Sequence, residues 1–151
     1  MALVLGTTYD NVFYDNVLDK LRSIITTDRA CTVYVSPTYK DMGSYSVRIW
    51  GLSAETDVMH SSEWRKLYNV ELVIYVKGED GDERFYEQLY SDAERLYQLL
   101  YNNKESGTAT FSWYDGVVGE MVFDEFVDDE EGVDGLHAAR FSFSCRLDRA
   151  D

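Results

Sequence analysis

The residue types that most often do chemistry in proteins are few in this sequence and lie far apart. The only histidines are His60 and His137. His60 and Glu63 have a spacing that would place both side chains on one helical turn, where a metal ion can bind. A metal site also needs further ligands and hydrogen-bonded neighbours, which the surrounding sequence does not offer. We therefore expect His60 to be an ordinary loop histidine, and we predict no metal site.

Acidic residues are abundant, but their spacing matches no metal or catalytic site. Residues 78–83 have the composition of a calcium-binding loop without its ligand positions, so we expect a turn in which Asp82 caps a following helix. Residues 124–134 contain no basic residue, and we interpret them as a solvated loop of like charges. The acidic residues of this stretch are Asp124, Glu125, Asp128, Asp129, Glu130, Glu131 and Asp134.

Motifs of enzymes and cofactor sites are absent from the sequence. There is no glycine-rich phosphate loop, no nucleophile elbow and no cluster of cysteine and histidine. Cys31 and Cys145 each lie in a candidate strand, and we expect two free thiols, although the sequence is also compatible with a bridge between them. We predict that the protein is not an enzyme and binds no cofactor.

Length and charge narrow the class of protein. A chain of 151 residues fits one domain, 1–151, that buries a hydrophobic core. The net charge of −14 disfavours binding to the phosphate backbone of nucleic acids, which requires a basic surface. The start of the chain is not basic, its apolar run is too short for a signal peptide, and no stretch is long enough to span a bilayer. We therefore expect a soluble protein made in a cytoplasm, with no membrane partner.

The clearest strand and the clearest helix are neighbours in the sequence. Residues 67–77 alternate, and one face of the strand is entirely apolar: Tyr68, Val70, Leu72, Ile74 and Val76. Residues 83–102 form a helix whose core stripe is Phe85, Leu89, Ala93, Leu96 and Leu100. A flank of tyrosines widens this stripe beyond what one sheet face needs: Tyr86, Tyr90, Tyr97 and Tyr101. These tyrosines either pack at the sheet edge or form a subunit interface.

The remaining elements complete a mixed fold. An amphipathic helix is expected up to residue 28, with Thr8 or Asp10 as its cap. Strands are expected at 30–36, 45–52, 109–114, 117–126 and 136–147, with a hairpin turn at Asp115–Gly116 and a second hairpin around the acidic stretch. This order predicts an α+β domain with a mostly antiparallel β-sheet and two main helices packed on one face.

This layout resembles that of the tail terminator and neck proteins of tailed bacteriophages. The segments that carry the resemblance are 10–25, 68–76, 85–101 and 139–147. The resemblance implies a structural virion protein that forms a ring, usually a hexamer. The ring caps the tail tube, joins it to a neck or connector protein, and leaves a channel through which DNA passes without specific binding. The family supplies no catalytic residues, and the long acidic stretch has no counterpart in it.

Two surfaces acquire candidate roles from this resemblance. The tyrosine flank becomes a candidate interface between subunits, and the acidic stretch becomes a candidate lining of the channel or a docking site for a basic neighbour. Two other interpretations stay open from the sequence. One is another neck or head-completion protein, and the other is a small α+β domain that binds a ligand or acts as an enzyme.

Overall fold

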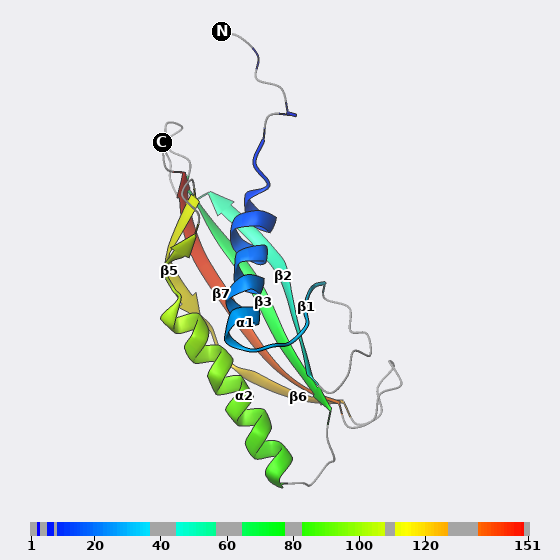
Figure 1. Cartoon of the computed structure of the whole chain (residues 1–151). Coiled ribbons are helices and arrows are strands. Elements are labelled where there is room, and N and C mark those ends of the chain that lie inside the picture. Colours follow the sequence, from blue (N-terminus) through cyan, green and yellow to red (C-terminus); the bar gives the residue numbers. More distant parts are fainter. Residues whose placement is uncertain are drawn as a thin grey trace.

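The computed structural model describes residues 3, 6–7, 9–36, 45–56, 65–77, 83–107, 111–126 and 136–149. These residues confirm the predicted α+β class, with a mostly antiparallel sheet and two main helices on one of its faces (Figure 1). The elements in chain order are η1 (Phe13–Leu18), α1 (Asp19–Asp28), β1 (Val33–Val35), β2 (Tyr45–Thr56), β3 (Arg65–Lys77), α2 (Glu83–Asn102), β4 (Ser106–Gly107), β5 (Phe111–Val118), β6 (Val122–Phe126) and β7 (Leu136–Arg149).

Within the described part of the chain, seven strands form one sheet in the order β1-β2-β3-β7-β5-β4, and β6 also pairs with β7. β1 and β2 are parallel, and the other pairs are antiparallel. β3 lies at the centre, hydrogen-bonded to β2 on one side and to β7 along its whole length on the other. The sheet therefore has its longest and most continuous pairing between β3 and β7.

The predicted alternation of the central strand is confirmed. The five apolar residues of β3 that share one face are each at most 7% exposed, and they belong to the hydrophobic core under the helices. The facing residues of β7 continue this core: Ala139, Phe141, Phe143, Cys145 and Leu147.

The helices lie side by side on this apolar face, α1 over β2 and β3 and α2 beside β5 and β7 (Figure 1). α2 has the predicted bounds, and Leu89, Ala93, Leu96 and Leu100 are buried as expected. The first helix also ends at Asp28 as predicted, but it begins with a π-helical turn, η1. Its N-cap is Val12, which makes no side-chain hydrogen bond, so the prediction that Asp10 caps the helix is wrong. Thr8 and Asp82, the other predicted caps, lie outside the described residues.

The π-helical turn seats one aromatic ring directly on the sheet. The Phe13 ring packs edge-on against Tyr68 of β3, with 4.8 Å between the ring centres. A Cβ atom at Gly51 of β2 would lie 2.6 Å from Cζ of Phe13, so only glycine leaves room for this ring. The residue pair Phe13 and Gly51 therefore fixes how closely the first helix approaches β2.

β2 is longer than the sequence predicts. The strand was expected to end near Leu52, but pairing with β3 continues to Thr56 after a register shift between Gly51 and Ser53. Residues 51–56 are all exposed, so neither side of the strand is selectively apolar and no alternation is visible in the sequence. β2 and β3 together form a long antiparallel pair where the sequence indicated an irregular loop.

The predicted hairpin turn at Asp115–Gly116 is wrong. Both residues lie inside β5, at a point where the β5–β7 register shifts by one residue between Tyr114 and Val117. The register shifts again before β6, because Val118 pairs with Phe143 whereas Val122 pairs with Arg140. Asp115 adopts φ 53°, a conformation that aspartate tolerates better than most residues and that suits a bulge as well as a turn. The predicted second hairpin is confirmed as the antiparallel pair of β6 and β7.

Neither helix in the described part of the chain is both long and apolar enough to cross a bilayer.

Candidate functional site

The tyrosine flank of α2 divides into two inward and two outward side chains. Tyr86 and Tyr97 are partly buried against the hydrophobic core. The Tyr86 ring lies 5.4 Å from the ring of His137, and the Tyr97 ring lies 6.4 Å from that of Phe141, measured between ring centres. These two tyrosines therefore stabilise the contact between α2 and β7 within one chain.

The outward members of the flank are Tyr90 and Tyr101, which are 51% and 54% exposed. The Tyr90 ring packs edge-on against Phe123 of β6 at 5.0 Å, and Phe123 is itself 41% exposed. Tyr101 lies near the end of α2, where the Nζ atom of Lys104 lies 4.4 Å from the centre of its ring. Of the predicted interface, these two side chains remain available to a partner.

Tyr90 lies at an edge of the sheet where four apolar side chains are exposed, and we call this group the β6 edge surface. Tyr90 and Phe123 are on the face that carries the helices, and Val117 and Val122 are on the opposite face. All four side chains are more than a third exposed. Among the described strands, β6 pairs only with β7, so the outer edge of β6 carries backbone groups without a strand partner. Exposed apolar side chains beside an open strand edge are typical of protein interaction sites. The sequence did not identify this surface, because the two register shifts hide which residues of β5 and β6 share a face.

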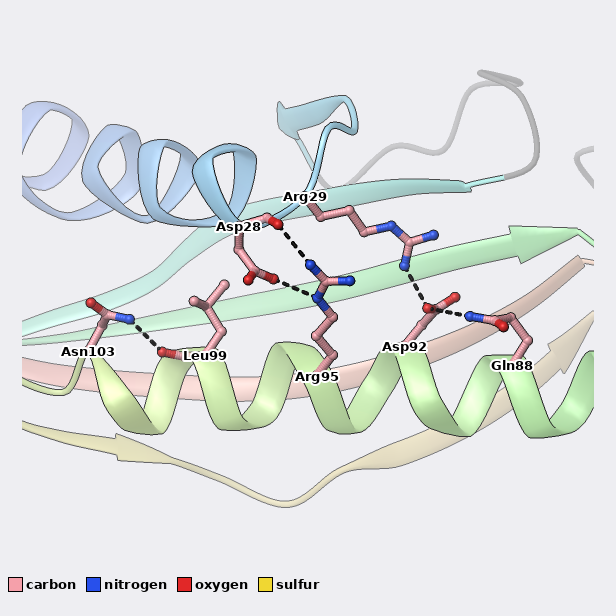
Figure 2. Close-up of polar contacts among 7 residues, drawn as sticks. All are labelled: Asp28, Arg29, Gln88, Asp92, Arg95, Leu99 and Asn103. Atoms are coloured by element: carbon pink, nitrogen blue, oxygen red, sulfur yellow. Dashed lines mark hydrogen bonds and ion pairs between the residues drawn. The ribbon is translucent and has the colours of Figure 1, made fainter.

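Two ion pairs join α2 to the end of α1 (Figure 2). Nη1 of Arg29 donates to Oδ1 of Asp92 at 2.6 Å, and Nε2 of Gln88 donates to the same oxygen at 2.9 Å. One turn further along α2, Arg95 donates to the side chain and the backbone carbonyl of Asp28, at 2.9 and 2.8 Å. We call the two ion pairs, Arg29–Asp92 and Arg95–Asp28, the helix clamp. Sequence patterns could not predict the clamp, because Arg29 and Asp92 are 63 residues apart.

The clamp lies over Tyr45, the first residue of β2. The guanidinium of Arg29 lies 3.9 Å from the centre of the Tyr45 ring, an attractive cation–π distance. Burial raises the pKa of Tyr45 to about 12, although the positive charge of Arg29 partly opposes that effect. Arg29 therefore connects α2, the end of the first helix and the sheet.

Beyond the clamp, an open groove of about 460 Å³ lies between the two helices. We call it the helix groove, and its lining residues are Lys20, Ser23, Ile24, Thr27, Asp28, Leu99 and Asn103. Ile24 and Leu99 are partly buried and supply apolar walls, whereas Ser23 and Thr27 are exposed at the rim. Its volume lies within the range of roughly 300–1,000 Å³ that is usual for ligand sites. The groove is thus large enough to receive a few side chains of another segment.

The sheet face opposite the helices carries arginines that are paired with carboxylates. Nε of Arg65 donates to Asp148 at 2.7 Å, and the hydroxyl of Tyr114 donates to the same carboxylate at 3.2 Å. Arg140 lies 3.8 Å from Glu71, and on β7 Arg146 lies 3.7 Å from Asp115. Each of these three arginines is therefore offset by a carboxylate close to it.

The described residues bring together no group of three or more His, Cys, Asp and Glu side chains that could hold a metal ion. His137 is 2% exposed and packs against the rings of Phe85 and Tyr86, so it is part of the core. His60 lies outside the described residues.

Both cysteines are free thiols, as predicted, and Cys31 lies just before β1 rather than within a strand. Cys145 is fully buried in β7, and burial raises the pKa of its thiol to about 12. A thiol with so high a pKa carries almost no thiolate at neutral pH, so Cys145 is a poor nucleophile.

The acidic stretch begins in β6. Asp124 and Glu125 are paired with Ala138 and His137 of β7 through the backbone, so the stretch starts at the open edge of the sheet. Its other acidic residues, Asp128, Asp129, Glu130, Glu131 and Asp134, lie outside the described residues. No protein-family model and no curated protein matches the chain.

Proposed function

We propose that this protein is a ring-forming structural subunit of a tailed bacteriophage, a tail terminator that caps the tail tube and joins it to the head. The observation that carries this proposal is the β6 edge surface. With two exposed apolar side chains on each face, the open edge of β6 offers a second protein chain apolar area to bury and backbone groups to pair with. The α+β layout that the resemblance requires supports the same assignment.

The position of this surface is compatible with a ring. β6 pairs with β7 on the side away from β3, off the main strand order, and β1 lies at the opposite edge of the sheet. When such a surface binds a different surface of the next copy, the contact is head-to-tail, and repeated head-to-tail contacts close into a ring if the rotation allows. The resemblance suggests six subunits, with the tail tube protein and a neck or connector protein as further partners in the virion.

The charge of the chain suits a passage for DNA. Several copies of the acidic stretch around one axis would repel phosphate groups, so the duplex would pass without binding. If the stretch instead faced outward, it would attract a basic neighbour through contacts that weaken as salt increases. We favour the channel position.

The experiment is to measure the assembly of a variant whose β6 edge surface is made polar. Light scattering after size-exclusion chromatography should show a ring for the natural chain and a monomer for the Tyr90→Ser, Phe123→Ser double variant. Tyr14→Ser is the matched control, because Tyr14 is also exposed, at 40%, but lies on η1. Electron microscopy of purified tail tubes mixed with the protein should show capped ends. A monomeric natural chain at high concentration that caps no tube would disprove the proposal.

The helix groove favours one other function, binding of a small ligand by a monomer. A ligand that binds the folded state raises the melting temperature with its concentration, so a thermal-shift screen on a monomeric protein would identify this case. A different neck component would also form rings, and images of the assembled particle would place it away from the end of the tail tube.

A further inference from the structure

The N-terminal segment and the helix groove each leave apolar surface uncovered in the single chain. Leu3 is 84% exposed and Tyr9 is 75% exposed. Figure 1 shows the described part of this segment leading away from the sheet and the helices. Residues 2–9 include Leu3, Val4 and Leu5 and contain no charged side chain. We call residues 2–9 the N-terminal arm.

The helix groove has the chemistry to receive such an arm. Its walls include Ile24 of α1 and Leu99 of α2, both only partly buried. Lys20 and Asp28 stand at its rim with opposite charges, so the groove has no net charge of its own. An uncharged apolar segment is the kind of partner that gains most from such a site, because it buries apolar area and leaves no charge desolvated.

Charge also limits which surfaces of two copies can come into contact. Each chain carries a net charge of −14, so most pairs of surfaces on two copies repel each other. The arm is uncharged over eight consecutive positions, whereas residues 144–151 include four charged side chains. Contact between an uncharged arm and a charge-balanced groove brings two copies together with little repulsion.

We propose that the N-terminal arm of one subunit binds the helix groove of a neighbouring subunit. Leu3 is exposed in its own chain, so the arm does not occupy its own groove, and a second copy is left as its acceptor. Each copy then supplies one arm and one groove, a head-to-tail exchange that is compatible with a closed ring. This inference rests on the self-assembly part of the proposed function and adds a second contact to the one at the β6 edge surface.

The first experiment measures how fast a disulfide forms between two different chains. Both chains carry Cys31→Ser, which removes the more accessible native thiol. One chain carries Leu3→Cys and the other carries Ser23→Cys at the rim of the groove. The control replaces Ser23→Cys with Thr26→Cys, because Thr26 is also exposed on α1 but does not line the groove. We expect the mixed disulfide to form at least tenfold faster with Ser23→Cys. Equal rates would overturn the inference, as would rapid closure of a disulfide within one chain that carries Leu3→Cys and Ser23→Cys.

The second experiment separates this inference from the proposed function. Leu3→Ser with Leu5→Ser, and separately Ser23→Trp, should weaken self-association at least tenfold, whereas Thr26→Trp should not. If the ring forms unchanged in the arm variant but dissociates in the Tyr90→Ser, Phe123→Ser variant, the arm exchange is wrong and the ring proposal stands. If the arm exchange is detected but the assembly caps no tail tube, the proposed function is wrong and the arm exchange stands.

Discussion

Nη1 of Arg29 lies 2.6 Å from Oδ1 of Asp92, a carboxylate on the middle of α2 that is only 6% exposed. Buried carboxylates are rare unless they are paired, because removing the charge from water costs several kcal/mol. The end of the first helix thus supplies the charge that allows Asp92 to be buried. The ion pair between Arg29 and Asp92 therefore holds the two helices together, in addition to their apolar contacts with the sheet.

Removing the guanidinium of Arg29 should therefore lower stability more than removing an arginine whose carboxylate partner is exposed. We expect Arg29→Ala to lower the free energy of unfolding by about 2–3 kcal/mol, below the full value for a buried pair because Arg29 is partly exposed. Arg22→Ala is the control, since Arg22 and Asp19 form a surface pair at 3.9 Å. Urea unfolding of both variants, and of Arg29→Ala with Asp92→Ala, measures the coupling between the partners. Equal losses for Arg22→Ala and Arg29→Ala would contradict this account.

Stability should fall at alkaline pH because Cys145, Tyr68 and the partly buried Tyr45 keep their protons to higher pH in the folded state. Burial raises the pKa of the Cys145 thiol from 9.0 to about 12, and it raises those of Tyr45 and Tyr68 from 10.0 to about 12. As the pH rises, the unfolded chain loses these protons first. The stabilisation from Cys145 is complete below pH 9 and is lost as the pH approaches 12.

The loss attributable to Cys145 should approach about 1.4 kcal/mol per pH unit inside that window. Urea unfolding between about pH 8 and pH 11 measures the slope. Cys145→Ala is the control, and its unfolding free energy should fall less steeply above pH 9. A variant with the same slope as the natural chain would show that Cys145 does not contribute.

The tyrosines of α2 should separate into stability and assembly residues. Tyr97→Ser removes a ring that packs against Phe141 and should lower the free energy of unfolding by about 2 kcal/mol. Tyr90→Ser removes a half-exposed ring and should cost less than about 1 kcal/mol while weakening self-association. Thermal unfolding of dilute protein and light scattering of concentrated protein distinguish the two effects. A Tyr90→Ser chain that assembles normally would remove Tyr90 from the interface.

Two glycines of the β5–β6 segment should differ in their tolerance of a methyl group. A Cβ atom at Gly116 would lie 2.7 Å from the backbone of Lys104, so Gly116→Ala should cost about 1–3 kcal/mol. At Gly119 the Cβ atom would instead meet the hydroxyl of Ser142, an exposed side chain that can rotate. Urea unfolding should show that Ser142→Ala recovers most of the loss in Gly119→Ala. Equal, unrecovered losses at both glycines would contradict this distinction.

Neutralising the acidic stretch tests its role in the proposed ring. Asn and Gln at positions 128–131 keep the side-chain size and remove four negative charges. If the stretch lines a channel, particles should assemble normally and deliver DNA more slowly, because the repulsion that keeps phosphate groups away from the channel wall would be weakened. Counting assembled particles and timing DNA release measure these two steps. Failed joining of heads and tails would point to docking, and unchanged assembly and delivery would exclude both roles.

The sequence predicted the elements whose two faces differ strongly and missed those whose faces do not. β3 and α2 have long apolar stripes, so their type and face were evident before the structure. The far half of β2 is exposed on both sides, so its sequence shows no alternation and predicts a loop. In β5 and β6 each register shift adds one residue, so Trp113, Val118 and Phe123 point to the helices at intervals of five residues, an odd spacing that regular alternation does not produce.

The candidate surfaces were predictable only in part. The tyrosine flank was visible in the sequence, but the side chains that face outward depend on which strands lie beneath the helix. Tyr97 lies over Phe141 of β7, whereas Tyr90 lies over Phe123, which is itself exposed in β6. The helix clamp and the helix groove arise from residues distant in sequence, for which periodicity gives no signal.

The two register shifts opposite β7 also constrain how this protein can change in length. Each shift moves all later residues to the opposite face of the sheet. After the second shift, odd-numbered residues face the helices again, as they do before the first shift. Phe123 therefore faces α2 and Val122 faces away. Deletion of one residue near Gly116 would turn Val122 toward the helices and Phe123 away from them. The contact between Phe123 and Tyr90 would then be lost, although neither residue is replaced. An insertion of one residue before Val122 would restore it. Related chains should therefore gain or lose residues in this segment only in compensating pairs.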